Sequence, residues 1–255
     1  MKIRFSLLLI LLASINLFAQ IEMPSLSPKK ITTQKVGLAD FTIEYGQPSK
    51  NGREIFGTLI PYNKLWRTGA NASTKITIDK DVLLAKHKIP AGTYGLYSIP
   101  NEKEWTIIIH KESNLWGSGG YKKENDLIRF TIPSKKLIDT QETLNIYFEK
   151  FNVDGADLII SWENTKIVIP VFVDSDTSIQ KQINDKIINS NTDVKPQTYF
   201  DAAQFYYQKN KNLNTAYKWF TKASKLRPGA FWYTYYKAEL ANKLGKKKDC
   251  QTRSC

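Results

Sequence analysis

Two arginines in the segment 47–74 carry the most definite chemistry in the sequence. Arg53 and Arg67 lie among Gly, Pro, Asn and aromatic residues, in a stretch that lacks strand or helix periodicity. A guanidinium group binds carboxylates, phosphates or sugar hydroxyls, and it stacks on aromatic rings such as those of Tyr62 and Trp66. The alternative is that each arginine bonds to loop carbonyls or to a carboxylate, and so holds the loop in shape.

Aromatic and charged residues elsewhere give a second group of candidates. Exposed rings can form a stacking platform for a sugar, whereas aromatic residues on strands belong more often to the core. Asp126 and Arg129 stand three residues apart, and they belong either to a site or to a structural ion pair. Asn71 contacts a ligand or caps a turn through its side chain. The candidate ligand-binding residues are therefore Arg53, Tyr62, Trp66, Arg67, Asn71, Trp116, Asp126 and Arg129.

The sequence shows no recognisable catalytic pattern. His87 and His110 are its only histidines, and neither lies at a spacing typical of metal ligands. There is no Gly-x-Ser-x-Gly motif, and Gly117–Gly120 lacks the spacing of a phosphate-binding loop. A carboxylate pair for glycoside hydrolysis needs a separation of roughly 5–10 Å, which the sequence does not give. We therefore expect no metal and no cofactor, and we assign no catalytic residue.

The segment 47–74 must be positioned by the elements on either side of it. A structureless stretch longer than roughly 12–15 residues is uncommon in a compact domain, and is usually functional or disordered. Its aromatic and aliphatic residues argue against disorder, so we expect an ordered loop on a rigid scaffold.

Alternating apolar residues predict that this scaffold is all-β. About ten short strands separated by Gly/Pro turns favour an antiparallel β-sandwich over residues 20–174, with a hairpin turn at Asp79-Lys80-Asp81. The expected strands are 31–36, 40–45, 75–79, 82–85, 93–99, 105–110, 127–132, 144–148, 157–162 and 166–173.

The periodicity becomes helical after Asp174. An amphipathic helix is expected around Ile179–Ile188, and the spacing of Phe200, Ala203, Ala216, Phe220, Ala223 and Pro228 is typical of a tetratricopeptide repeat. Residues 175–255 hold about one and a half such units, because a second unit starts and the chain stops inside its second helix; such a tail cannot bury its own apolar faces well. We therefore expect it to pack on the β-domain or on Ile179–Ile188, or to be a truncated form of something longer, and to offer a surface to a protein partner.

The N-terminus has the pattern of a secretory signal peptide over residues 1–19. Lys2 and Arg4 precede a short apolar run, and Ala19 offers a small residue for cleavage. That run is far below the ~18 residues that span a bilayer, and no later segment approaches this length. We therefore expect an exported protein, periplasmic or extracellular, without a transmembrane segment in its mature form.

The net charge of +13 is concentrated in the tail. Residues 175–255 carry 15 Lys and Arg against 6 Asp and Glu, which leaves only +2 for residues 20–174. An exported protein rarely meets nucleic acid, so we expect no nucleic-acid partner. Cys250 and Cys255 are the only cysteines, which excludes a disulfide scaffold and a thiolate zinc site from the main domain.

An ordered series of motifs runs from roughly Ser25 to Val173. It includes Gly52-Arg53, Ile55-Phe56-Gly57, Pro61-Tyr62, Trp66-Arg67-Thr68-Gly69-Ala70-Asn71, Pro90-Ala91-Gly92-Thr93-Tyr94, Trp116-Gly117 and Asp126 to Arg129. This series resembles the exported bacterial family called domain of unknown function 2911. The resemblance implies export in a Gram-negative bacterium, a β-rich domain and, often, a tetratricopeptide-like tail. It implies no established activity, and His110 stands where such proteins usually have Asn.

These observations lead to three functional hypotheses. The first is a non-catalytic envelope protein that binds a small molecule or glycan near Arg53, Arg67 and Asn71 and a protein through its tail. The second is a hydrolase acting on envelope or polymeric carbohydrate. The third is a purely structural protein, in which the loop is a plug.

Overall fold

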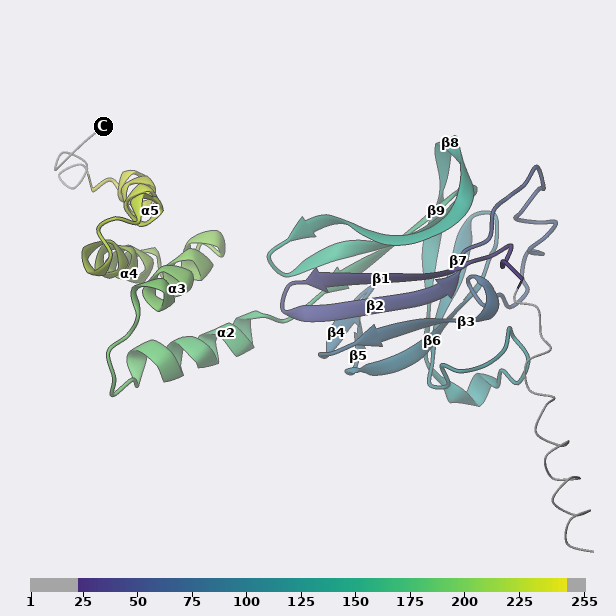
Figure 1. Ribbon diagram of the computed structural model, residues 1–255, viewed down its shortest axis with the longest axis horizontal. Helices are drawn as coiled ribbons and strands as arrows, with labels where there is room; N and C mark the ends of the chain where they lie inside the picture. Colours follow the sequence, from purple (N-terminus) through teal and green to yellow (C-terminus); the bar gives the residue numbers. More distant parts are fainter. Residues whose placement is uncertain (1–22, 247–255) are drawn as a thin grey trace, which may run out of the picture.

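The computed structural model describes residues 23–246 of the chain. The expected signal peptide over residues 1–19, Cys250 and Cys255, and the second helix expected for the second repeat lie outside the described residues. Apart from a short 3-10 helix, η1 (Lys123–Asn125), the strands of the described part precede its helices along the chain (Figure 1). An all-β antiparallel fold followed by a small helical tail is therefore confirmed.

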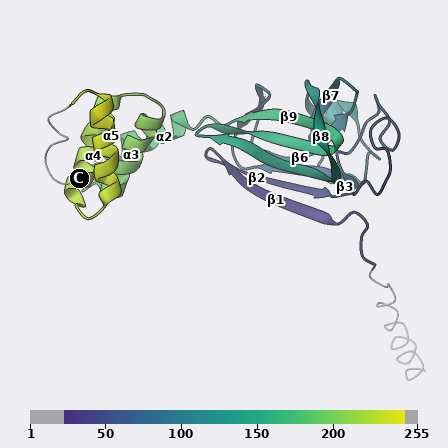
Figure 2. The ribbon, with the colours of Figure 1, turned by 90° about the horizontal axis from the view of Figure 1, so that it is seen from above.

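Nine strands form one continuous antiparallel sheet in the order β1-β2-β3-β6-β7-β8-β9-β4-β5. The sheet folds over so that its two halves face each other and enclose the core (Figure 2). The strands are β1 (Lys29–Val36), β2 (Ala39–Gly46), β3 (Ala70–Ile78), β4 (Val82–Leu84), β5 (His87–Ile89), β6 (Gly92–Ile99), β7 (Glu104–His110), β8 (Asp126–Asn152) and β9 (Gly155–Phe172).

Strand alternation explains why this chain folds into a sandwich. In β2, Phe41, Ile43 and Tyr45 are buried, whereas the residues between them face outward. The two halves meet where the ring of Phe41 contacts that of Phe148 on β8, with 5.2 Å between ring centroids. The hydroxyl of Tyr45 accepts a hydrogen bond from the backbone N–H of Ile146 at 3.1 Å.

Two expectations about the strands were wrong. The four strands expected between residues 127 and 173 are only two, β8 and β9, because bulges between Lys136 and Asn145 let β8 bend from one half of the sandwich to the other. The hairpin expected at Asp79-Lys80-Asp81 does not form. Instead β3 pairs with β2 and β6, and β4 pairs with β5 and β9.

The tail contains the helices α2 (Asp176–Ile183), α3 (Pro196–Gln208), α4 (Leu213–Leu226) and α5 (Phe231–Lys243), with a π-helical turn, η2 (Asn184–Ile188), after α2. Ile183 belongs to the core of α3, α4 and α5, and Ile179 and Ile187 pack against it. The expected packing of the tail on Ile179–Ile188 is therefore confirmed. None of the helices in residues 23–246 is long and apolar enough to cross a lipid bilayer.

The tail also contacts the β-domain through its side chains. Lys209, just after α3, forms an ion pair with Asp154 in the β8–β9 turn. Its Nζ also lies 2.7 Å from a carboxylate oxygen of Asp176 at the start of α2. Leu38, in the β1–β2 turn, lines a cavity of about 280 Å³ together with residues of α2, η2 and α3.

Candidate functional site

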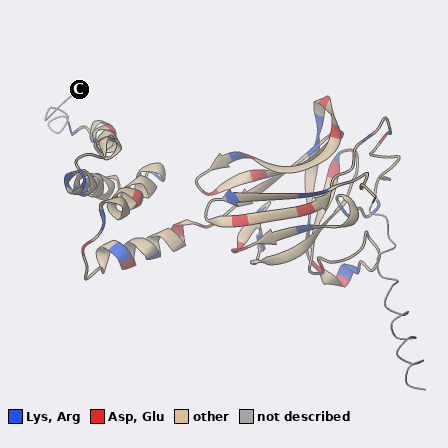
Figure 3. Ribbon diagram, in the orientation of Figure 1, with Lys and Arg blue, Asp and Glu red and all other residues tan. Residues whose placement is uncertain are grey.

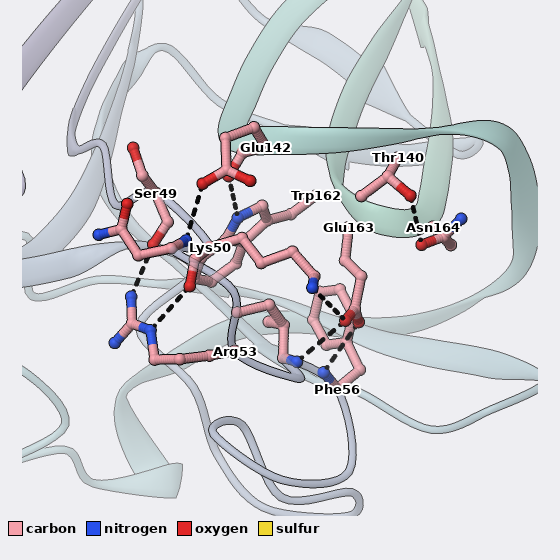
Figure 4. Close-up of polar contacts among 11 residues, drawn as sticks. Ser49, Lys50, Arg53, Phe56, Thr140, Glu142, Trp162, Glu163 and Asn164 are labelled. Carbon is pink, nitrogen blue, oxygen red and sulfur yellow. Dashed lines mark hydrogen bonds and ion pairs between the residues drawn. The ribbon is translucent and has the colours of Figure 1, made fainter.

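The loop between β2 and β3 is ordered, and its first half is bonded to the bend in β8. The backbone N–H of Lys50 donates to the carbonyl of Glu142 at 2.7 Å. The next amide, that of Asn51, donates to the Glu142 carboxylate, also at 2.7 Å (Figure 4). The bend in β8 therefore fixes the start of the loop through both the backbone and the side chain of one residue.

Glu163 on β9 fixes the next part of the loop. Its carboxylate accepts hydrogen bonds from the backbone amides of Ile55 and Phe56, at 3.2 and 3.4 Å, and lies 4.0 Å from Nζ of Lys50 (Figure 4). Glu163 lies at a bulge opposite Gln141 and has φ +53°, a backbone conformation that residues other than glycine rarely adopt. No sequence pattern distinguishes this glutamate from the other acidic residues on strands.

Arg53 is engaged by its own loop. Its Nε donates to the carbonyl of Lys50 at 2.9 Å and its Nη2 to the carbonyl of Ser49 at 2.6 Å (Figure 4). The guanidinium group thus holds the loop in shape through loop carbonyls, which is the alternative stated for the arginines from the sequence.

Trp66 is part of the core rather than an exposed platform. It is 5% exposed, and its ring lies within about 6 Å of those of Phe56, Trp105 and Trp162. Its indole N–H donates to the carbonyl of Gly69 at 3.0 Å. Because all its contacts are internal, we do not retain Trp66 as a ligand contact.

Tyr62 lies on the other side of the loop, in a polar cavity of about 560 Å³. Its ring packs on Gly57, where a Cβ would lie 2.9 Å from the ring. Glu54, Glu102 and Glu163 line the same cavity. Burial raises the pKa of the Tyr62 hydroxyl, and these carboxylates raise it further.

Arg67 differs from Arg53 in that its guanidinium bonds to none of the residues that the structure describes. It is half-buried, and its guanidinium forms no hydrogen bond or ion pair with any residue in the described range 23–246. The group packs on Gly117: a Cβ there would lie 2.4 Å from Nη1, and the φ of +68° also favours glycine at this position. An unpaired, partly buried cation is energetically unfavourable, and the Arg67 guanidinium has donors that can bind an anion.

Asn71 and Trp116 lie beside Arg67 and Gly117. The carbonyl of Asn71 accepts a hydrogen bond from the N–H of Gly117 at 3.1 Å, and Ala72 forms a β-bridge with Trp116. The amide of Asn71 donates to the carbonyl of Ser27 at 3.2 Å. Trp116 is 74% exposed. The structure therefore brings three of the predicted residues, Arg67, Asn71 and Trp116, to one surface.

Asp126 and Arg129 form a closed network with Tyr121. Arg129 pairs with the Asp126 carboxylate, and the Tyr121 hydroxyl donates to that carboxylate at 2.7 Å. Burial and then Asp126 raise the pKa of Tyr121 to about 12. This network adjoins the Arg67 surface through Tyr97, whose hydroxyl donates to the carbonyl of Gly117 at 3.3 Å. The charges of Asp126 and Arg129 neutralise each other, so they support the surface rather than contact a ligand.

The ring of His110 is held by backbone groups. His110 is fully buried, and its ring nitrogens contact the backbone of Glu112 and Lys122 at 3.1 Å. Nδ1 lies 3.1 Å from both the amide and the carbonyl of Glu112, and Nε2 lies 3.1 Å from the carbonyl of Lys122, so both ring nitrogens are engaged by the backbone. Across the described residues, no group of three or more His, Cys, Asp or Glu is arranged to bind a metal.

Comparison with known proteins identifies the family. A search of curated proteins gives no match, and neither does a search of solved structures. A family model with the description "Protein of unknown function (DUF2911)" matches residues 27–171, which include the whole loop and the Arg67 surface. Because this match covers more than half of the chain, the protein belongs to the DUF2911 family.

Proposed function

We propose that this is an exported, non-catalytic envelope protein whose β-domain, residues 20–174, binds an anionic small molecule or glycan at the Arg67 surface. The observation that carries the proposal is the half-buried Arg67 guanidinium, which has no partner among the residues of the described chain. A guanidinium presents several N–H donors in a planar fork that matches a carboxylate or phosphate. An anion bound here would supply the missing partner.

The hydrolase hypothesis has weaker support. The cavity at Tyr62 does gather three carboxylates, but that of Glu163 is occupied by the two loop amides. Glu54 and Glu102 are exposed. A general acid at neutral pH normally needs a buried carboxyl group with a raised pKa, and exposure works against this.

The purely structural hypothesis accounts for part of the loop. It explains Arg53, whose donors are taken by loop carbonyls, and Trp66, whose ring is in the core. It leaves the charge of Arg67 and the exposure of Trp116 unexplained. Binding therefore accounts for more of the geometry.

The helical tail, residues 175–255, is proposed to contact another protein. Phe231 and Tyr235 stand one turn apart on α5 and are 76% and 61% exposed. Lysine and arginine outnumber acidic residues on the tail (Figure 3). Exposed aromatic rings within a basic surface suit a partner with acidic and apolar groups.

A glycan array combined with titrations of small carboxylates and phosphate tests the binding proposal. Wild type is compared with Arg67→Ala, and Arg53→Ala serves as the matched control because its guanidinium already has partners. We expect binding that is lost in Arg67→Ala and retained in Arg53→Ala. If wild type and Arg67→Ala behave alike on every ligand, the proposal is wrong.

A further inference from the structure

A small cavity adjoins the Arg67 surface, and its size and lining indicate which class of ligand would fit there. It has a volume of about 200 Å³, and its lining includes Ser25, Ser27, Asn71, Ser73 and Trp116. This volume is below the range of a site for a drug-sized molecule, and it suits a single ring. Hydroxyl, amide and carbonyl groups on its walls can exchange hydrogen bonds with a hydroxylated ligand.

Trp116 supplies a flat apolar wall that is open to solvent. Trp116 is 74% exposed, whereas large aromatic side chains are usually mostly buried. Its backbone is nevertheless held firmly, by the bridge to Ala72 and by the bond between Gly117 and Asn71. An exposed ring on a fixed backbone loses little conformational freedom when another ring stacks on it.

The charge around the cavity favours a single negative group. Glu44 on its wall is paired with Lys29 at 2.8 Å and lies 3.7 Å from Lys75, so these three residues together carry one excess positive charge. Arg67 does not line the cavity itself, but it packs on Gly117, the residue after Trp116. A ligand that extends from the Trp116 ring across Gly117 would therefore reach the Arg67 guanidinium.

We infer that the ligand is a carboxylated saccharide, with one sugar ring on Trp116 and its carboxylate on Arg67. This inference rests on the proposed function of the Arg67 surface and specifies its ligand. Asn71 positions the ring: its amide is held by the Ser27 carbonyl, and its Oδ1 accepts no hydrogen bond from the described residues. That oxygen is available to a sugar hydroxyl.

A carboxylate fits this surface better than a phosphate. One planar guanidinium matches one carboxylate in a two-bond arrangement. A phosphate group carries up to two charges, and phosphate sites in proteins typically add backbone amides at a helix N-terminus or a glycine-rich nest. No α-helix of the described chain begins at this surface, and the glycine-rich segment 117–120 contributes a carbonyl to Tyr97 and an amide to Asn71 at Gly117, so phosphate is kept as a probe in the test. The exposed indole also offers stacking, which a free anion cannot use.

Titration calorimetry with matched oligosaccharides tests the inference. The probes are uronic-acid oligomers (galacturonate, glucuronate and mannuronate), neutral oligomers of the same lengths, and inorganic phosphate. Arg67→Gln keeps most of the side-chain volume without the charge, Trp116→Ala removes the ring, and Arg53→Gln is the control. We expect wild type to bind a uronic-acid oligomer at least about tenfold more tightly than its neutral counterpart, a ratio typical of one charged hydrogen-bonded contact.

The variants separate the inference from the proposed function. Arg67→Gln should abolish the preference for the acidic oligomer, Trp116→Ala should weaken both saccharides, and Arg53→Gln should change neither. Equal binding of acidic and neutral oligomers, or binding of phosphate that is unaffected by Trp116→Ala, would overturn the inference while leaving a binding function in place. If no probe binds the wild type, the proposed function fails as well.

Discussion

Replacing Glu163 with Ala should destabilise the β-domain markedly. The Glu163 side chain is 16% exposed, and its carboxylate serves the amides of Ile55 and Phe56, residues that are 0% and 5% exposed. Each buried amide left without an acceptor costs about 1–1.5 kcal/mol, so we expect a loss of about 2–3 kcal/mol in the free energy of unfolding. For a chain of this size, that lowers Tm by about 4–12 °C, measurable by calorimetry and urea unfolding.

Two further variants identify the cause of that loss. Glu163→Gln keeps an amide oxygen that can accept one of the two N–H groups, so it should lose roughly half as much stability. Glu102→Ala removes an exposed carboxylate from the same cavity, and it should change stability by no more than about 0.5 kcal/mol. If Glu163→Ala is as mild as Glu102→Ala, the loop is not anchored by this carboxylate.

Four other predictions follow from contacts of the described residues. Arg53→Ala should lower the free energy of unfolding by about 0.5–1 kcal/mol, because it removes two exposed hydrogen bonds that hold the loop. Arg67→Ala should lower it by less than about 0.5 kcal/mol, and equal losses in thermal unfolding would contradict the distinction. Gly117→Ala places a Cβ 2.4 Å from Nη1 of Arg67 at a φ of +68°, so it should displace the guanidinium and lower the free energy of unfolding, measured in urea, by at least about 1 kcal/mol. Full stability with unchanged ligand binding would refute this prediction. Lys209→Met should broaden the distribution of distances between spin labels on the tail and on the β-domain, because Lys209 pairs with Asp154 as well as with Asp176. Lys211→Met, which removes a pair to Asp176 alone, should leave this distribution unchanged. Identical distributions in both variants would show that Lys209 does not fix the tail. The hydrogen bonds from Lys209 and Lys211 lower the pKa of Asp176 below 3.8, so the carboxylate stabilises the fold fully above that pH, and this stabilisation is lost as the pH falls through the lowered pKa. Asp176→Asn should therefore make the free energy of unfolding depend less steeply on pH below about pH 4. An unchanged pH dependence in that range would contradict this prediction.

The sequence predicts the β-domain well because its strands are half-buried and antiparallel. Alternation in β2 indicates directly which residues face the core, and the structure buries Phe41, Ile43 and Tyr45 as expected. Continuity of β8 cannot be predicted in the same way. Its bend places Leu137 to Thr140 in an irregular stretch, so the alternation is interrupted although the strand continues.

The candidate site could be predicted only as a list of residues. Arg53 and Arg67 have similar neighbours in the sequence, yet their environments differ. The difference depends on partners that are close in space: carbonyls of the same turn for Arg53, and a glycine 50 residues away for Arg67. Glu163, which holds the loop, lies about 110 residues along the chain from the two amides whose hydrogen bonds it accepts, and no local sequence pattern predicts this contact.

Scaffolding and binding need not be alternatives for this loop, because its two halves have different environments. The half from Gln47 to Trp66 is bonded to Glu142 and Glu163 and packs its aromatic rings into the core, which makes it rigid. The half after Trp66 joins β3 and carries Arg67 and Asn71 at the surface, against Gly117. A cation held half-buried without a partner needs a rigid support, since a mobile side chain would move into solvent instead. The anchoring of the first half therefore provides the support that keeps Arg67 in place for an anion.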